Sequence, residues 1–156
     1  MIKRVTVIAS AIIGAAAAAA ASAAGAVYFR STTASVDLSN DSGVAVTVKS
    51  VVIPAGTWLI TAKATAVNFS EADYVRCQIL VNGVQKDASA TLVGNAAPGP
   101  TGELGPSAAE IVLQAAVTTT VTRTFALACS HDFETSGIYV DPQASIMVST
   151  APGALN

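Results

Sequence analysis

Apolar and polar residues alternate most regularly over Tyr74–Val81, which predicts a β-strand with one buried face. One face carries the apolar residues Val75, Cys77, Ile79 and Val81. The other face carries Tyr74, Arg76 and Gln78, with Leu80 as its only aliphatic residue. Asn82-Gly83 follows directly, and this pair readily adopts the positive φ angles that a two-residue hairpin turn requires. The pattern therefore predicts a hairpin from this strand into Val84–Leu92.

Other stretches repeat this pattern and predict further strands: Ala34–Leu38, Gly43–Ile53, Thr57–Val67, Val121–Cys129, Ile138–Val140 and Ala144–Thr150. Within Gly43–Ile53 the valines at 44, 46 and 48 are expected to share one face. We interpret Val27–Thr33 as a polar lead-in and Gly94–Pro106, rich in glycine and proline, as an irregular loop. Eight or nine short strands at spacings of about 8–12 residues predict an all-β fold, a two-sheet sandwich of jelly-roll type.

Ile111–Val117 is the one stretch whose pattern fits two structures. Ser107-Ala108-Ala109-Glu110 before it matches a capping box, which would begin a short helix. The β-branched residues around it, and Thr118-Thr119-Thr120 after it, favour a strand. We expect a strand.

The strand Thr57–Val67 is expected to form the centre of the core. One face carries large and then small apolar side chains, Trp58, Ile60, Ala62, Ala64 and Ala66. Trp58 is the only tryptophan in the chain and is predicted to anchor the core. The row of alanines implies a bulky neighbour or a closely packed second sheet.

The chain has two cysteines, and both fall on predicted buried faces. Cys129 ends a run in which it shares a face with Phe125 and Leu127. In an exported chain, two cysteines are best interpreted as one disulfide, Cys77–Cys129, with two free buried thiols as the alternative. Such a disulfide would stabilise the fold by roughly 4 kcal/mol in the chain-entropy model.

Residues 1–26 have the features of a cleavable signal peptide. A basic start, Lys3-Arg4, precedes an uncharged alanine-rich stretch, and small residues offer cleavage sites after Ala23 or Ala26. A retained membrane anchor is the alternative, because the uncharged stretch reaches the roughly 20 residues that a spanning helix needs. We expect secretion, a bacterial host with such an alanine-rich leader, and one domain over 27–156.

Charge excludes some classes of partner. The net charge is −2, and removal of Lys3 and Arg4 with the leader would make it −4. No basic cluster remains in the domain, so a surface for nucleic acid or anionic membrane is not expected.

Candidate catalytic residues are few. Ser130-His131-Asp132 places triad residue types side by side, but a triad requires the base to reach the nucleophile, which adjacency does not provide. We interpret His131, the only histidine, as a solvated loop residue. One histidine and two paired cysteines cannot complete a zinc site. The acidic pairs Glu71/Asp73 and Asp132/Glu134 are interpreted as solubilising loop residues, with glycoside hydrolysis as the alternative.

The segment Val52–Lys63, with Pro54 and Gly56 followed by Trp58 and an alternating strand, resembles small extracellular jelly rolls. It is similar to the globular heads of complement components, to tumour-necrosis-factor-like proteins and to exported bacterial relatives of both. The resemblance implies a jelly roll that often assembles as a trimer and serves adhesion, ligand binding or a surface coat. An immunoglobulin-like sandwich fits less well, because Trp58 precedes Cys77 and Leu127 occupies the position of the characteristic tyrosine.

The sequence thus predicts a secreted, non-enzymatic structural, adhesive or ligand-binding module without cofactor or metal. Its partner is expected to be an extracellular protein or glycan, or further copies of itself. A secreted effector or inhibitor acting through Gly94–Pro106 is the first alternative, and a small hydrolase using His131, Asp132 and Glu134 is the second. Any active surface is expected on the loops Asn68–Asp73, Gly94–Pro106 and Ser130–Gly137.

Overall fold

The computed structural model describes residues 25–151, and these form strands, turns and loops without a helix. Most of the predicted signal peptide and the last five residues, 152–156, lie outside this range. Among the described residues, no helix is long and apolar enough to cross a membrane. The strands are β1 Val27–Ser31, β2 Val36–Asp37, β3 Val46–Ile53, β4 Gly56–Val67, β5 Asp73–Val81, β6 Val84–Val93, β7 Ala108–Thr119, β8 Arg123–His131, β9 Tyr139–Val140 and β10 Ser145–Thr150.

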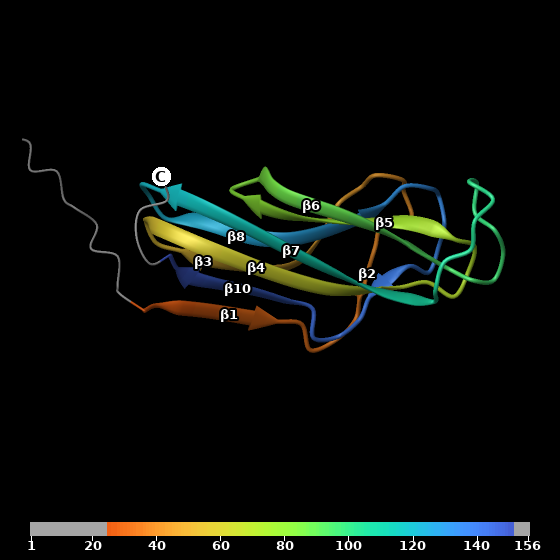
Figure 1. Ribbon diagram of the computed structural model, residues 1–156, viewed down its shortest axis with the longest axis horizontal. Helices are drawn as coiled ribbons and strands as arrows, with labels where there is room; N and C mark the ends of the chain where they lie inside the picture. The colour runs from red at the N-terminus through yellow and green to blue at the C-terminus, as the bar shows by residue number, and fades with distance from the viewer. Residues whose placement is uncertain (1–24, 152–156) are drawn as a thin grey trace, which may run out of the picture.

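The strands form two antiparallel sheets packed face to face (Figure 1). In sheet A, β1, β10, β4 and β7 lie side by side, and the short strands β9 and β2 extend the sheet beside the far end of β4. In sheet B the order is β3-β8-β5-β6. The pairs are nested, with β5–β6 inside β4–β7, then β3–β8, and β1–β10 outermost. This is a jelly roll, as the sequence predicts.

The innermost hairpin turns at Asn82-Gly83, where both residues adopt positive φ angles of 51° and 81°. These values match the two central positions of a hairpin turn whose twist suits the flanking strands. All the other strand pairs enclose this turn in the sequence. The hairpin with the shortest connection is therefore the innermost pair of the jelly roll. The predicted hairpin is confirmed.

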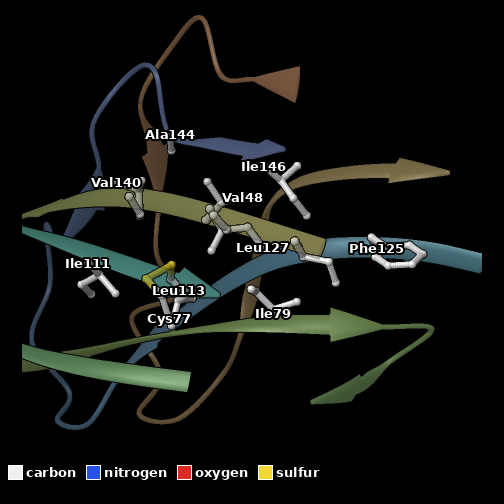
Figure 2. Packing of buried hydrophobic residues seen from close by; sticks show 14 of the residues in the cluster. Val48, Cys77, Ile79, Ile111, Leu113, Phe125, Leu127, Val140, Ala144 and Ile146 are labelled. Carbon is white, nitrogen blue, oxygen red and sulfur yellow. A yellow bond between two sulfur atoms is a disulfide. The ribbon is translucent and has the colours of Figure 1, made fainter. Parts of the chain in front are cut away.

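The core lies between the two sheets (Figure 2). The inward faces of β4 and β5 are those predicted from parity, and Trp58 is 1 % exposed. The indole N–H of Trp58 donates to the Pro54 carbonyl at 3.1 Å, which satisfies its one polar group. The alanine row of β4 and the bulky residues Phe125 and Leu127 of β8 belong to the same buried cluster.

The predicted disulfide Cys77–Cys129 is confirmed, and it joins neighbouring strands of sheet B. Cys77 of β5 lies directly opposite Cys129 of β8, with 4.1 Å between the Cα atoms. Such a short separation is typical of a non-hydrogen-bonded antiparallel pair. Because both side chains are fully buried, the disulfide forms part of the core.

The interpretation of Val27–Thr33 as a polar lead-in is wrong, because Val27–Ser31 forms the edge strand β1. Its partner is the last long strand, from Val27 opposite Ser149 to Ser31 opposite Ser145. Only Tyr28 faces inward to meet the core, edge-on to Trp58 with ring centroids 5.7 Å apart. The strand depends on a partner more than a hundred residues away, so its own alternation gives little signal.

The strand expected at Ile111–Val117 is confirmed but is longer, and the alternative capping box does not begin a helix. Residues 108–110 continue β7 and pair with residues 67–65 of β4. The twelve residues of β4 pair with β7 along their whole length. Strand pairing has therefore overridden a local helix signal.

Other strand bounds differ from prediction by a few residues, and the differences in β3 and β8 change which residues are buried. In β3 the register shifts between Thr47 and Lys49, so the buried residues are Val48, Val51 and Ile53, while Val44 precedes the strand and is exposed. A bulge of this kind interrupts the two-residue period. β8 begins and ends two residues later than predicted, which places His131 inside the strand.

Candidate functional site

The loops expected to carry an active surface gather at one end of the sandwich. We call this the loop end, made of residues 38–45, 68–72, 94–107 and 132–138. Backbone hydrogen bonds connect its segments, among them Asn68 N to Ser107 O at 2.8 Å and Gly43 N to His131 O at 2.7 Å. In Figure 1 these loops lie together at the right-hand end.

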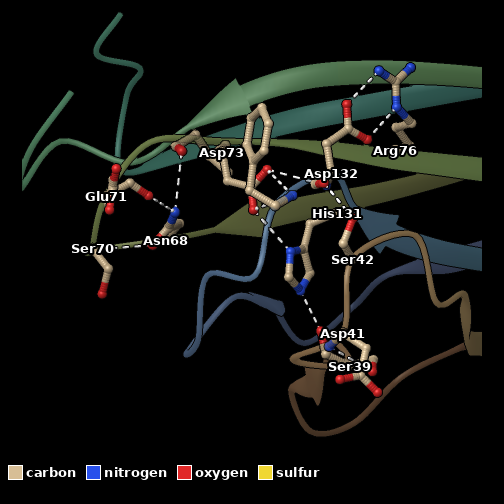
Figure 3. A network of polar contacts seen from close by, with 12 residues as sticks. Ser39, Asp41, Ser42, Asn68, Ser70, Glu71, Asp73, Arg76, His131 and Asp132 are labelled. Carbon is tan, nitrogen blue, oxygen red and sulfur yellow. Dashed lines mark hydrogen bonds and ion pairs between the residues drawn. The ribbon is translucent and has the colours of Figure 1, made fainter. Parts of the chain in front are cut away.

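The loop end is organised around a buried hydrogen-bonded pair of side chains, Asp73 and His131 (Figure 3). Asp73 is the first residue of β5 and His131 the last of β8, and their side chains are 0 % and 1 % exposed. His131 Nδ1 lies 2.9 Å from Asp73 Oδ2. The same carboxylate accepts from the backbone N–H groups of Asp132 and Phe133 at 3.2 Å. The prediction that His131 is a solvated loop residue is therefore wrong.

Both ring nitrogens of His131 face acceptors. Nδ1 faces the Asp73 carboxylate, and Nε2 contacts the backbone carbonyl of Ser39. Both ring nitrogens are therefore engaged by the fold. The ring connects β5, β8 and the loop before β3 and leaves neither nitrogen free for a substrate.

Asp132 forms an ion pair on the outer face of sheet B. Arg76 donates from Nε and from its terminal nitrogen to the two Asp132 carboxylate oxygens, each at 2.5 Å. The hydrogen bonds that Arg76 donates to Asp132 raise the pKa of Arg76, which stays charged at any physiological pH. The Ser42 hydroxyl donates to the Asp132 carbonyl at 2.5 Å and attaches the neighbouring loop. This bidentate geometry fixes both planar groups relative to the strand.

The Arg76–Asp132 pair lines a groove of about 390 Å³, which we call the sheet-B groove. Polar side chains of the three strands β5, β6 and β8 line the groove. The small side chains of Ala88 and Ala45 leave the space between them open. The parity that buries Val75, Cys77 and Ile79 directs the two residues between them, Arg76 and Gln78, outward. The polar side chains that line it are Arg76, Gln78, Gln85, Ser130 and Asp132.

Tyr74 extends this polar surface toward the loop end. Its hydroxyl donates to Glu103 Oε2 at 3.3 Å. The negative charge of Glu103 is the main cause that raises the pKa of Tyr74 above its ordinary value. The contact links β5 to the glycine- and proline-rich loop that the sequence marks as irregular.

The structure does not bring the proposed hydrolase residues to one point. His131 is occupied inside the fold, Asp132 is held by Arg76, and Glu134 is exposed. The other acidic pair is also divided, because Asp73 is buried while Glu71 is exposed. Within residues 25–151 no three His, Cys, Asp or Glu side chains group closely enough to hold a metal ion.

Sequence reasoning missed Asp73 and Arg76 as organising residues, although a signal was present. Asp73 shares the parity of the buried residues 75, 77, 79 and 81, and His131 that of 125, 127 and 129. Polar residues that continue an inward row at a strand end are candidates for a buried pair.

No protein-family model matches the chain, and no curated protein matches it in sequence. Among solved structures, it is similar to the structure of infectious bursal disease virus Gx strain, with a TM-score of 0.52 and 17 % identity over 84 % of this chain. The chain spans about a third of the length of that structure, 33 %. It also aligns with the CBM36-1 domain of a multidomain xylanase from the hindgut metagenome of Trinervitermes trinervoides, with a TM-score of 0.43 and 14 % identity, covering 83 % of this chain and 100 % of that one. The likeness to the virus structure shows the fold alone, which is that of a jelly-roll β-sandwich.

Proposed function

We propose that the protein is an exported, non-enzymatic binding module that holds a neutral, hydroxyl-rich ligand, such as a glycan, in the sheet-B groove. The observation that carries this proposal is the Arg76–Asp132 pair, fixed by two hydrogen bonds of 2.5 Å on the wall of an open groove. Binding sites of this kind combine a concave surface with a few fixed polar groups.

The hydrogen-bonding groups of the groove complement those of a sugar. Each sugar hydroxyl both donates and accepts, and so does each of the amides of Gln78 and Gln85. Arg76 uses two of its five N–H groups on Asp132, which leaves donors for ligand oxygens. Because the two charges neutralise each other, the groove favours neutral ligands over charged ones.

The size of the groove sets the expected affinity. A volume of about 390 Å³ accommodates a disaccharide. At about 0.3 kcal/mol per non-hydrogen atom, a ligand of roughly 20 such atoms binds with about 6 kcal/mol. This corresponds to a dissociation constant of roughly tens of micromolar.

The disulfide supports export as part of the proposal. A buried disulfide between Cys77 and Cys129 forms and persists in an oxidising compartment. Together with the leader-like residues 1–26, it favours a site of action outside the cell, where glycans of walls and surfaces are available.

Calorimetric titration of the full chain with the neutral disaccharides cellobiose, maltose and lactose tests the proposal. Ala88→Trp should fill the groove from an exposed position and abolish binding. Val112→Trp, an exposed substitution on the opposite sheet, is the matched control and should bind as the wild type does. Equal binding by both variants, or no binding of any disaccharide at millimolar concentration, would reject the proposal.

A second candidate function, self-assembly into a surface coat, is favoured by the outer face of sheet A. Four apolar side chains there lie in adjacent register positions: Val27, Phe29, Leu59 and Met147 are 61 %, 54 %, 40 % and 40 % exposed. The resemblance to complement heads and tumour-necrosis-factor-like proteins makes a trimer the expected assembly. Light scattering on the wild type should then give three times the mass of one chain. The double variant Phe29→Ser with Met147→Thr should give the mass of a single chain. A wild-type monomer at high concentration would reject it.

A further inference from the structure

A second groove lies at the end of the sandwich opposite to the loop end. It has a volume of about 530 Å³ and lies between the β5–β6 turn, the last residues of β7 and the start of β8. We call it the hairpin-end groove. Its polar and small lining residues include Asn82, Lys86, Ala116, Thr118, Thr120 and Arg123.

The charges of this groove are all positive. Lys86 and Arg123 are the only ionisable residues in its lining. Neither belongs to an ion pair within residues 25–151, whereas Lys63 lies 4.0 Å from Glu110 and Arg76 lies 2.5 Å from Asp132. Two cations without a carboxylate in a chain of net charge −2 mark a local site for anions.

Unpaired backbone donors follow the same groove. β7 is an edge strand that pairs only with β4, and Gln114 N–H points away from β4 to donate to Asp87 Oδ2 at 2.8 Å. Because N–H direction alternates with a period of two, the N–H groups of Ala116 and Thr118 point the same way. Both residues line the groove. The edge therefore offers two further donors beside the two cations.

The contact of Asp87 with β7 shows that the free N–H groups of this edge strand bind a carboxylate. The Asp87 carboxylate receives Gln114 N–H through one oxygen and Ala88 N–H, at 2.9 Å, through the other. The next two N–H groups of β7 that point away from β4 are those of Ala116 and Thr118. The charged residues that line the groove with them are the cations Lys86 and Arg123 and no carboxylate. A carboxylate of a ligand would occupy at Ala116–Thr118 the position that Asp87 occupies at Gln114.

We infer that the hairpin-end groove binds the carboxylate groups of an acidic polysaccharide, a polyuronate in chemical class. The hydroxyl and amide groups of Asn82, Thr118 and Thr120 suit sugar oxygens next to the carboxylate. An acidic peptide added as a strand is less favoured, because Asp87 already occupies Gln114 N–H and interrupts the free edge. This site is separate from the sheet-B groove and does not depend on it.

The test uses polygalacturonate and its fully methyl-esterified form, in which each carboxylate is replaced by a neutral methyl ester. The full chain should bind the free acid at least tenfold more tightly than the ester, since hydrogen bonds to charged groups are the stronger ones. Lys86→Gln and Arg123→Gln should each weaken binding about tenfold. Ala116→Trp should abolish it by filling the groove from an exposed position.

Two control variants separate this site from the rest of the molecule. Lys49→Gln removes a cation outside the groove, and Ala88→Trp fills the sheet-B groove, so both should bind polygalacturonate as the wild type does. Equal binding of acid and ester, or wild-type binding by Ala116→Trp, would overturn the inference. Binding of polyglutamate without binding of polygalacturonate would overturn it in favour of an acidic peptide, and binding of neither would overturn it outright.

Discussion

Asp73 Oδ2 and His131 Nδ1 lie 2.9 Å apart at the point where β5 begins and β8 ends. Both side chains are fully buried, and the second ring nitrogen of His131 holds the Ser39 carbonyl. The pair thereby positions Asp132, the next residue, which carries the ion pair of the sheet-B groove. A structural pair inside the fold thus supports a polar site on its surface.

Removal of either partner of this pair should be costly. Asp73→Asn or His131→Gln leaves the other buried side chain without its hydrogen-bonding partner, and each should lower the free energy of unfolding by about 1–3 kcal/mol. The double variant should lose clearly less than the sum of the two, because it leaves neither partner unpaired. Urea unfolding of the four proteins measures this coupling. Single-variant losses below about 1 kcal/mol would show that the pair is not formed.

The disulfide should add to the free energy of unfolding without determining the strand arrangement. Cys77→Ser with Cys129→Ser should lower the free energy of unfolding by about 4 kcal/mol, because the reduced chain gains loop entropy over a separation of 52 residues. A thiol assay on native protein should find no free cysteine, and two titratable thiols there would refute the disulfide.

Gly99 should tolerate no side chain. A Cβ there would lie 1.9 Å from the Ala72 carbonyl oxygen, so Gly99→Ala must displace the loop 94–107 from the loop 68–72. Gly102→Ala is the comparison, since a Cβ there meets open space and the cost is only that of a positive φ, about 1–2 kcal/mol. Hydrogen exchange at Ala72 N–H, which donates to Ala97 O at 3.1 Å, should accelerate in the first variant. Unchanged protection of that amide in Gly99→Ala would contradict this packing.

Tyr74 should titrate above its ordinary pKa of 10.0 because of the negative charge on Glu103. Glu103→Gln should lower the pKa of Tyr74 toward that value, and Glu110→Gln, on the other sheet, should not. The neutral phenol is the hydrogen-bonded form, so the contact is present below pH 10 and is lost as the pH rises through the raised pKa. Absorbance titration with Tyr74→Phe as the reference identifies this tyrosine. No shift on Glu103→Gln would show that the two groups do not interact.

The sequence was sufficient for the strands whose buried face is continuous. β4 and β5 show strict alternation because one face of each packs into the core, and Asn82-Gly83 specifies its turn locally. The disulfide followed from two inward cysteines. β1 could not be predicted in this way, since its hydrogen bonds depend on a strand at the other end of the chain.

The buried pair was within reach of the sequence but was not predicted. Once Cys77 is placed opposite Cys129, antiparallel register places Val75 opposite His131, and Asp73 lies one step further along the same inward face. The contact with Ser39 was not predictable, because it depends on where a loop of irregular backbone returns to the sheet. Likewise, the sheet-B groove depends on residues from three strands whose order only the tertiary fold defines.

Amide chemical-shift mapping by NMR tests most directly whether the sheet-B groove binds a neutral glycan. Titration of the full chain with cellobiose, maltose or lactose should shift the backbone amides of Arg76, Gln78 and Ser130 and the side-chain amides of Gln78 and Gln85. Amides of the hairpin-end groove, such as Thr118, should not move. Shifts confined to residues outside the sheet-B groove, or none at millimolar sugar, would contradict the claim.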